Sequence, residues 1–531
     1  MTDQTDRTFE PPQPPRRRRR RRLLGLLAAV VVLGGGGAWL AGTVLRDDPG
    51  PQACGSAGSG VYDIDGECVG VTDGSFVFRP ELADIQRKIA AENARVRAAG
   101  APSVTVALLD PLTPATQDVL PDGAVRHRLE GAYTALRRVN STTVIGDPKP
   151  QIRLVLASEG STDAQWRHVT GQLVQMSKRT DSPLVAVIGL GISTAQTQRR
   201  AQALSGDGVP MVSAYLIADE LDYANIPHLI RTSPSNRYYV AALRSFVDST
   251  NLESGVVVRD SNSEDGRDLF TESLATNFEE QMSELKDFPT LQYTGTGVST
   301  VGVDPHLFSP VRANICAAAG NGLQAVLYAG REIDLPAFID SLERRPCPDA
   351  ELTILTAGLD LGEILDGRED ALRAANLKVV VAASVDTEGW SSGAPGTPAH
   401  FQDFLKAFVA PDFVPGVDEP GFDAEHVDDA NAILMHDALL AAVQAVRLAS
   451  PEGAISTPTP AGVRAQLLNL HGLHAVPGAS GTLSFSSDAP KGYPVDKPIP
   501  VLQYPHPALP GPTEGVSRQV GPLYQVARVV E

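Results

Sequence analysis

Ser193 and Thr194 are the residues whose position most clearly suggests binding chemistry. They follow a glycine-rich turn, Gly189 to Gly191, and that turn follows a short apolar run ending at Ile188. Glycine lets the backbone turn sharply and approach a ligand closely. Hydroxyl groups at the start of a helix cap its first turn, and the free N–H groups there attract an anion. The pattern predicts a ligand cradle, with a simple helix cap at Ser193 as the alternative.

Motifs for catalysis are absent from the sequence. It has no G-x-S-x-G nucleophile elbow, no P-loop and no complete G-x-G-x-x-G fingerprint. The ten histidines are scattered, and no C-x-x-C or H-E-x-x-H pattern indicates a metal site. We therefore expect a protein that is not an enzyme and that holds neither a cofactor nor a metal ion.

The N-terminal region has the features of a membrane anchor. Seven consecutive arginines, Arg16 to Arg22, precede 23 uncharged residues, Leu23 to Leu45. Such a segment is long enough to cross a bilayer, and its basic flank predicts a cytoplasmic N-terminus. A cleaved signal peptide is the alternative, but no small-x-small site lies near the end of the apolar run. We expect a single-pass protein of the cell membrane whose C-terminal domain is extracellular.

The region beyond the predicted span is acidic and contains all four cysteines. After residue 46 the chain carries 36 basic and 60 acidic residues, a net charge of −24, which argues against binding to nucleic acid. An even number of cysteines on the oxidising side of a membrane is typical of two disulfides. Three pairings are possible, and the simplest joins Cys54 to Cys68 and Cys316 to Cys347.

Short apolar runs alternate with helical patterns through most of the chain, which predicts an α/β fold with parallel sheets. A helix is expected from Pro80 to about Ala99, and Val61 to Phe78 reads as a disulfide-pinned hairpin. The other expected strands are Val104–Leu109, Ile152–Ala157, Leu184–Ile188, Gly255–Arg259, Ala325–Tyr328, Leu352–Thr356 and Val379–Ala383. The other expected helices are Val125–Asn140, Ala164–Lys178, Ser193–Ala203, Asn236–Asp248, Gly266–Met282 and Leu361–Ala374.

The ordered set of these segments resembles the type I periplasmic binding proteins, in the group of the leucine/isoleucine/valine receptors of ABC importers. The resemblance covers about residues 102 to 505. It is carried by VTVALLDPLT (104–113), LEGAYTALRRVN (129–140), VAVIGLGIST (185–194), GVPMVSA (208–214), IPHLIRTSPSN (226–236), the late helix Asp429–Ala449 and GASGTLSF (478–485).

The resemblance implies two Rossmann-like lobes with parallel sheets that close over a ligand. It maps lobe one to residues 102–252 and 395–470, and lobe two to residues 253–394 and 471–510. The remaining parts are an arginine-rich cytoplasmic tail (1–22), the transmembrane helix (23–45), a linker and disulfide-pinned extension (46–101), and a C-terminal tail (511–531).

The resemblance also implies where a small polar, amino-acid-like ligand binds. Its carboxylate would contact Ser193, Thr194, Ser213 and Ala214. Its ammonium group would need an acidic residue of lobe two, Asp360 first and Asp386 second. Tyr328 would line the cleft or belong to the core, and Asp265 stands where relatives often place an aromatic residue.

A substrate receptor tethered to the membrane, working with an ABC permease, is the function that this resemblance implies. An extracellular sensor domain that reports to a partner membrane protein is the alternative.

Overall fold

The chain divides into two compact units, Met1–Gln52 and Ala53–Glu531, and the second is an α/β structure. The computed structural model describes residues 52–56, 58–113, 123–162, 164–263, 267–296, 306–359, 361–365, 367–410, 420–450, 457–486, 491–507, 517–520 and 523–526. Within those ranges no helix is both long and apolar enough to cross a membrane. The predicted span at 23–45 falls outside them.

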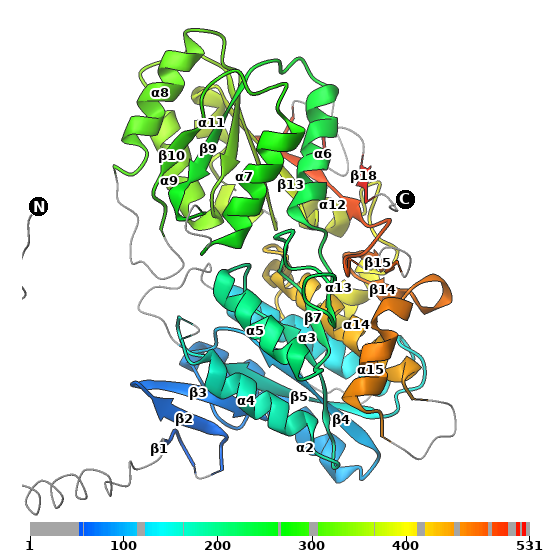
Figure 1. Ribbon diagram of the computed structural model, residues 1–531. Coiled ribbons are helices and arrows are strands. Elements are labelled where there is room, and N and C mark those ends of the chain that lie inside the picture. The colour runs from blue at the N-terminus through cyan, green and yellow to red at the C-terminus, as the bar shows by residue number, and fades with distance from the viewer. Residues whose placement is uncertain are drawn as a thin grey trace, which may run out of the picture. The chain divides into compact units, whose positions relative to one another are not determined.

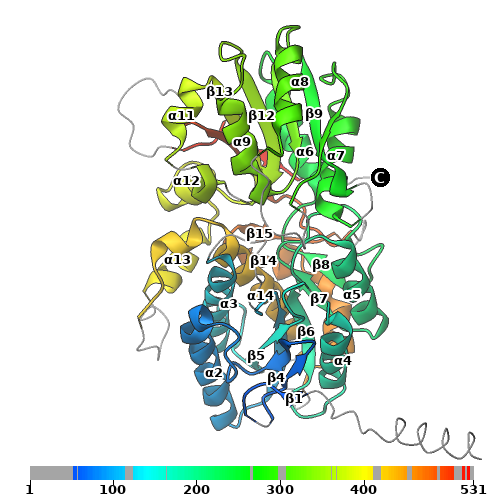
Figure 2. The same ribbon diagram turned by 90° about the vertical axis from the view of Figure 1, so that its left-hand side faces the viewer.

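The first lobe is built on an eight-stranded sheet in the order β1-β2-β3-β5-β4-β6-β7-β8, in the lower half of Figure 1. The strands from β4 to β8 are parallel. Their residues are mostly apolar because helices cover both faces of the sheet. Helices α2, α3 and α14 pack on one face and α4 and α5 on the other (Figure 2). The bounds are β1 Gln52–Ala53, β2 Val61–Ile64, β3 Glu67–Thr72, α2 Ala83–Ala98, β4 Ser103–Leu109, α3 Ala124–Ser141, β5 Gln151–Ser158, α4 Trp166–Ser177, β6 Leu184–Gly189, α5 Ala195–Gly206, β7 Met211–Ser213, β8 Leu229–Arg231, α13 Phe401–Val409, α14 Asn431–Leu448 and α15 Pro460–Gln466.

The second lobe contains a six-stranded sheet in the order β10-β9-β11-β12-β13-β17. Its strands are parallel except β17, which pairs antiparallel with β13. Helices α6 and α7 cover one face, and α8, α9 and α11 cover the other. The bounds are α6 Asn236–Asp248, β9 Gly255–Asp260, α7 Leu269–Gln281, β10 Leu291–Tyr293, α8 Ser309–Ala319, β11 Ala325–Ala329, α9 Leu335–Glu343, β12 Leu352–Gly358, α10 Gly362–Leu365, α11 Glu369–Ala374, β13 Leu377–Ala383, β16 Pro498–Ile499, β17 Val501–Tyr504 and β18 Tyr524–Gln525. Helix α12, Thr387–Ser391, follows β13, and its Trp390 packs into the core of the first lobe.

Helices α3 and α14 pack unusually closely at the centre of the first lobe. A Cβ atom built on Gly131 of α3 would lie only 2.0 Å from the carbonyl oxygen of Ala432 in α14. Nearly every residue of both helices is buried. The absence of a side chain at Gly131 is therefore what allows the two backbones to approach.

In the described ranges the chain crosses between the lobes after β8, after β13 and before β16, and a buried lysine joins the first of these crossovers to the third. Lys497, on the third crossover, donates from Nζ to the carbonyl of Thr232 on the first crossover, at 2.7 Å, and to Ser480 Oγ, at 2.7 Å. Burial lowers the pKa of Lys497 to about 8, although the charge of Asp437 opposes the shift. These contacts fix the crossovers to each other and to α14.

The observed lobes differ from the sequence-based boundaries in two places. Helix α6 was placed in lobe one, but its apolar face packs against the sheet of the second lobe. The hairpin of β14 (Val476–Gly478) and β15 (Gly481–Leu483) was placed in lobe two, but it packs against α14. Each segment adjoins a crossover, where apolar patterns indicate burial but not which sheet provides it.

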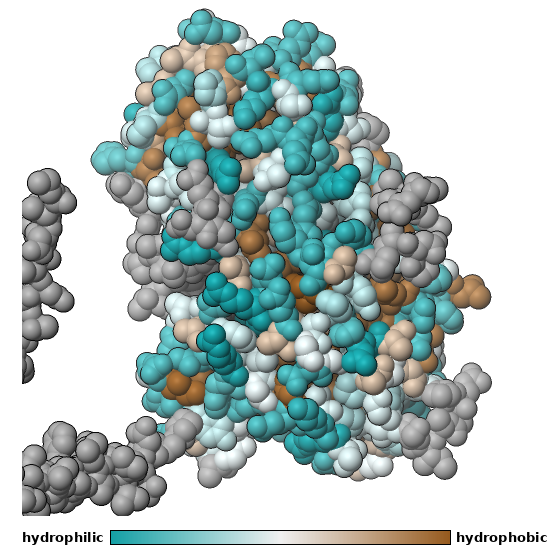
Figure 3. All heavy atoms as spheres, viewed as in Figure 1, coloured by the Kyte–Doolittle hydropathy of each residue, from teal (hydrophilic) through white to brown (hydrophobic). Residues whose placement is uncertain are grey.

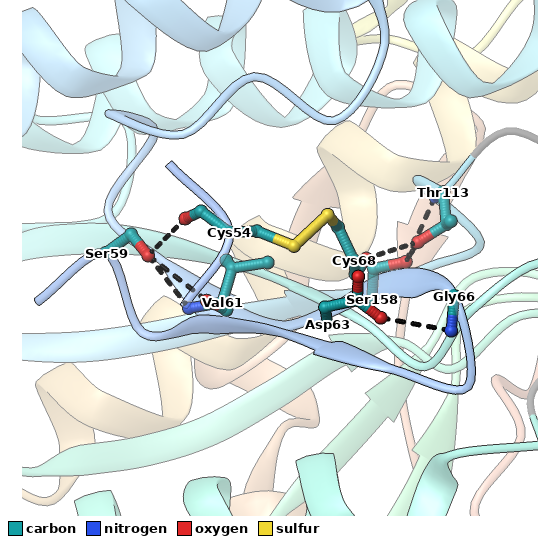
Figure 4. The surroundings of a disulfide bond; sticks show 8 residues. All are labelled: Cys54, Ser59, Val61, Asp63, Gly66, Cys68, Thr113 and Ser158. Atoms are coloured by element: carbon teal, nitrogen blue, oxygen red, sulfur yellow. Dashed lines mark hydrogen bonds between the residues drawn. A yellow bond between two sulfur atoms is a disulfide. The ribbon is translucent and has the colours of Figure 1, made fainter. Parts of the chain in front are cut away.

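The N-terminal extension forms an additional edge of the first sheet. Strands β2 and β3 form the predicted hairpin, and β3 pairs antiparallel with β5. A disulfide joins Cys54 to Cys68 beside this hairpin (Figure 4), and the Cys68 carbonyl accepts a hydrogen bond from Thr113 Oγ1 at 2.9 Å. The second disulfide joins Cys316 to Cys347, so both predicted pairings are confirmed.

Candidate functional site

The loop between β6 and α5 has a backbone that its sequence dictates. Gly189 and Gly191 adopt positive φ angles of 87° and 65°, which glycine tolerates best. Thr194 then caps α5, because its Oγ1 accepts a hydrogen bond from the backbone N–H of Thr197 at 3.1 Å. The result is a tight turn that presents Ser193 at the carboxyl end of the sheet, where ligands of parallel sheets bind.

Ser193 ties this loop to both lobes. Its Oγ accepts hydrogen bonds from the backbone N–H groups of Ile217 at 3.1 Å and Ala218 at 3.3 Å. Its carbonyl accepts from the N–H of Phe270 and from Arg331 Nη2, both at 3.3 Å and both from the second lobe. Ser193 therefore lies where the lobes meet.

Arg331 follows β11 and is held by a carboxylate of its own lobe. Its Nε and Nη2 donate to the two oxygens of Asp268 at 2.5 and 2.9 Å, a bidentate geometry that fixes the guanidinium plane. Asp268 is itself fixed, because it caps α7 by accepting from the N–H of Thr271 at 3.2 Å. The part of the chain that the structure describes provides no hydrogen-bond partner for Arg331 Nη1.

Arg128 on α3 is the corresponding cation of the first lobe. It donates to Asp110 and to the side-chain oxygen of Asn431, each at 2.8 Å, and its guanidinium lies 3.9 Å from the ring centre of Tyr215. Burial acts to lower the pKa of Arg128, but Asp110 and Tyr215 outweigh it and the pKa lies above its usual value. Arg128 therefore stays charged although it is almost fully buried.

A cavity of about 90 Å³ lies between the lobes at this position. It is smaller than the roughly 150 Å³ of an engineered cavity that holds benzene, so a larger ligand requires the lobes to separate. Figure 3 shows hydrophobic residues in the band between the lobes of an otherwise mostly hydrophilic face. The cavity is lined by Arg128, Ile192, Ser193, Tyr215, Ile217, Phe270, Arg331, Glu332, Ile333, Gly358 and Leu359.

Of the binding residues expected from the sequence, Ser193 lines this cavity. Thr194 is a buried helix cap, and Ala214 is fully buried. Ser213 Oγ donates to the Gly189 carbonyl at 3.2 Å and accepts from two backbone N–H groups, so it supports the loop from below.

Of the acidic and aromatic residues expected at the site, those that the structure describes are not among the residues that line the cavity. Tyr328 is core, with its hydroxyl 3.0 Å from that of Tyr293 and 3.2 Å from the Arg331 carbonyl. Asp386 is almost fully buried and caps α12. Asp360 and Asp265 lie outside the described residues.

Several lining residues were missed from the sequence, among them Arg128, Phe270, Arg331 and Glu332. Arg331 had a usable signal, since it follows a buried strand by two residues at the sheet edge where ligands bind. Arg128 had none, because an arginine within a helix pattern reads as solvent-exposed.

One group of described residues has a metal-ligand composition: His127, Glu130 and His426, with one ligand atom of each within 4.8 Å of the others. Arg126 Nη2 lies 3.4 Å from His127 Nε2 and 3.2 Å from His426 Nε2. Because a guanidinium already occupies the point on which the nitrogens converge, we assign no metal to this group.

No protein-family model and no curated protein matches the sequence. Solved structures do match. The ABC transporter substrate-binding protein from Desulfitobacterium hafniense in complex with Leu is 14% identical with a TM-score of 0.51, over 79% of this chain and 100% of that one. LivJ from Streptococcus pneumoniae with isoleucine is 16% identical with a TM-score of 0.51, over 75% and 95%.

A solute-binding protein of an ABC transporter from R. palustris, in complex with benzoate, is 16% identical with a TM-score of 0.54, over 80% and 98% of the two chains. These likenesses establish the fold, which is the two-lobed type I periplasmic-binding-protein fold that the sequence resemblance predicted. The matching proteins are substrate-binding or solute-binding proteins of transporters.

Proposed function

We propose that the protein is a membrane-anchored extracytoplasmic solute-binding protein that captures a small carboxylate between its lobes for an ABC importer. The cavity supports this proposal, because residues of both lobes line it and a ligand there would bridge them. Such bridging is how a ligand favours the closed arrangement of a two-lobed protein.

The polar lining favours an anionic group on the ligand. The Ser193 hydroxyl oxygen accepts hydrogen bonds from two backbone N–H groups. The described part of the chain provides no acceptor for the hydroxyl hydrogen. That hydrogen and Arg331 Nη1 are donors that a ligand carboxylate would satisfy. Arg128 adds positive charge nearby.

The rest of the lining suits an apolar body and leaves two ligand classes to distinguish. Ile192, Ile217, Phe270, Ile333 and Leu359 provide the apolar surface. Glu332 is the carboxylate among the lining residues, and it would attract the ammonium group of an amino acid. An aromatic acid without an ammonium group would use the apolar and cationic surfaces alone.

Anchoring and partner are part of the same proposal. The arginine run and apolar segment at 16–45 would hold the binding domain at the outer surface of the cell membrane. Two disulfides suit an oxidising compartment. An ABC permease is the proposed partner, and a sensor role would instead need a partner membrane protein that transduces the signal.

Thermal unfolding of the full-length protein in detergent tests ligand capture. Leucine, isoleucine, benzoate and 3,4-dihydroxybenzoate form the panel, and a ligand at a hundred times its Kd should stabilise by about 2.7 kcal/mol. Ser193→Ala should weaken binding about tenfold or more, because it removes a hydrogen bond to a charged group. Ser205→Ala, which loses one bond to the Pro227 carbonyl outside the cavity, should bind as the parent does.

Failure of the whole panel to raise the melting temperature would contradict ligand capture, and unchanged binding by Ser193→Ala would contradict the site. Anchoring is tested separately, by protease digestion of intact cells, which should remove the domain beyond residue 46. Recovery of the intact chain from the cytosol would contradict it. Loss of uptake after deletion would favour the importer over the sensor.

A further inference from the structure

A second, larger cavity lies in the first lobe at the opposite ends of the strands from the ligand site. Its volume is about 800 Å³. It opens between the N-terminal hairpin, α2, α4 and the first residues of the parallel strands β4 and β5. Thr105 near the start of β4 and Ser182 before β6 line it, whereas Ser193 follows the other end of β6. The two cavities are therefore distinct.

Arg153 is the residue of this cavity that needs an explanation. It lies near the start of β5, a strand otherwise almost entirely buried, on the same face as Val155. Its Nε donates to Ser182 Oγ at 3.0 Å and its Nη2 to Thr105 Oγ1 at 3.3 Å, both neutral groups. No carboxylate pairs with it in the described ranges. A half-buried cation with only neutral partners is destabilising.

Two further arginines increase the positive charge. Arg97 pairs with Asp73 at 2.9 Å and Arg179 pairs with Asp181 at 3.2 Å, and both guanidinium groups belong to the cavity wall. Among the lining residues Asp73 is the carboxylate that opposes the three arginines. Burial, and then the charges of Arg97 and Arg179, lower the pKa of Arg153, and the opposing charges of Asp181 and Asp73 only partly offset this shift.

Hydroxyl groups around the arginines complete a set of donors suited to an oxyanion. Ser59, Thr72, Ser75, Thr105 and Ser182 all line the cavity. The protein as a whole carries a net charge of −18, so a concentration of positive charge at one place is contrary to its general surface. Guanidinium groups recognise phosphate oxygens through paired hydrogen bonds.

We propose that this cavity binds a phosphate-type oxyanion, with Arg153 at its centre and Arg97 and Arg179 at its sides. The bound group would supply the negative charge that Arg153 lacks. Free inorganic phosphate and the phosphate of a lipid headgroup share this chemistry.

The test is thermal unfolding of the full-length protein in detergent, titrated with sodium phosphate against sodium chloride at equal ionic strength. Phosphate should raise the melting temperature. Arg153→Met should do two things at once: raise the melting temperature without phosphate, because it removes an uncompensated charge, and weaken the phosphate effect about tenfold or more. Arg199→Met, at an exposed site on α5, should change neither quantity.

A structural role for Arg153 predicts the opposite sign, a loss of stability in Arg153→Met with or without phosphate, and that result would overturn the proposal. So would equal effects of phosphate and chloride on the parent. Reconstitution into vesicles of zwitterionic phosphatidylcholine, with and without anionic phosphatidylglycerol, separates the two sources. The site is assigned to an anionic lipid headgroup if only phosphatidylglycerol raises the melting temperature of the parent, and to free phosphate if only the inorganic ion does. Ser193→Ala should retain the phosphate effect.

Discussion

Replacing Asp437 with asparagine should strongly destabilise the first lobe, because this carboxylate joins α14 to the β14–β15 turn. Asp437 is fully buried. One oxygen accepts from the N–H of Ala479 at 2.7 Å and lies 2.9 Å from His436 Nδ1. The other accepts from the N–H of Ser480 at 2.9 Å and from its hydroxyl at 2.5 Å.

The size of the loss follows from these four contacts. An asparagine keeps one acceptor oxygen and places an amide donor where the other oxygen was, so two hydrogen bonds are lost and donors face each other. Hydrogen bonds to a charged group contribute about 1.5 to 3 kcal/mol each. Breaking a buried charged network costs about 3 to 5 kcal/mol, and we expect a loss in that range.

Chemical unfolding followed by the fluorescence of Trp390, which is buried in the first lobe, measures the change. The control is Asp370→Asn, at a fully exposed side chain, which should lie within about 0.5 kcal/mol of the parent. A loss below about 1 kcal/mol in Asp437→Asn would refute the assignment of this carboxylate as a joint between α14 and the turn.

The pH dependence provides a second measure of the same residue. Burial raises the pKa of Asp437, but hydrogen bonds from His436 and Ser480 and the charge of Lys497 outweigh it, and the net shift is downward. A carboxyl group with a lowered folded pKa stabilises the fold above its unfolded pKa, and this contribution is lost as pH falls through the folded value. The stability of Asp437→Asn should therefore change less between pH 6 and pH 3 than that of the parent.

Three further predictions concern packing, cross-linking and acid stability. Gly131→Ala should cost about 1 to 3 kcal/mol because its Cβ would meet the backbone of α14, while Gly171→Ala on α4, with no atom within 4 Å, should be neutral or stabilising; melting curves of the pair decide this. Replacing Cys316 and Cys347 together with alanine should cost about 3 to 4 kcal/mol, from the 31-residue loop that the disulfide closes, and an unchanged denaturation midpoint would contradict it. Burial raises the pKa of Glu92, but hydrogen bonds and the charges of neighbouring arginines outweigh it, and the net shift is downward. The free energy of unfolding of Glu92→Gln should therefore fall less than that of the parent between pH 6 and pH 3, as measured by unfolding at those pH values.

The sequence by itself determined the local elements and their order. Apolar runs separated by glycine and helical patterns predicted most strands and helices within a few residues, and Asn236–Asp248 was predicted to the residue. The single helix expected at Leu361–Ala374 is instead two short helices, α10 and α11, and helices α8 and α9 were not predicted. The hairpin, both disulfides and the tight turn before Ser193 were predicted as well. These features depend on neighbours in the chain, on backbone freedom at glycine and on period, all of which a sequence displays directly.

Tertiary structure alone decided which side chains meet. Arg331 pairs with Asp268 of its own lobe and reaches the Ser193 carbonyl of the other lobe, and no local pattern relates those positions. Arg153 reads as one charged residue in a strand, and its lack of a carboxylate partner becomes visible only when β4, β5 and α4 surround it. The reason is physical. Burial and pairing of a charge depend on atoms contributed by segments far away in the sequence, whereas helix and strand periods depend on residues adjacent in the sequence.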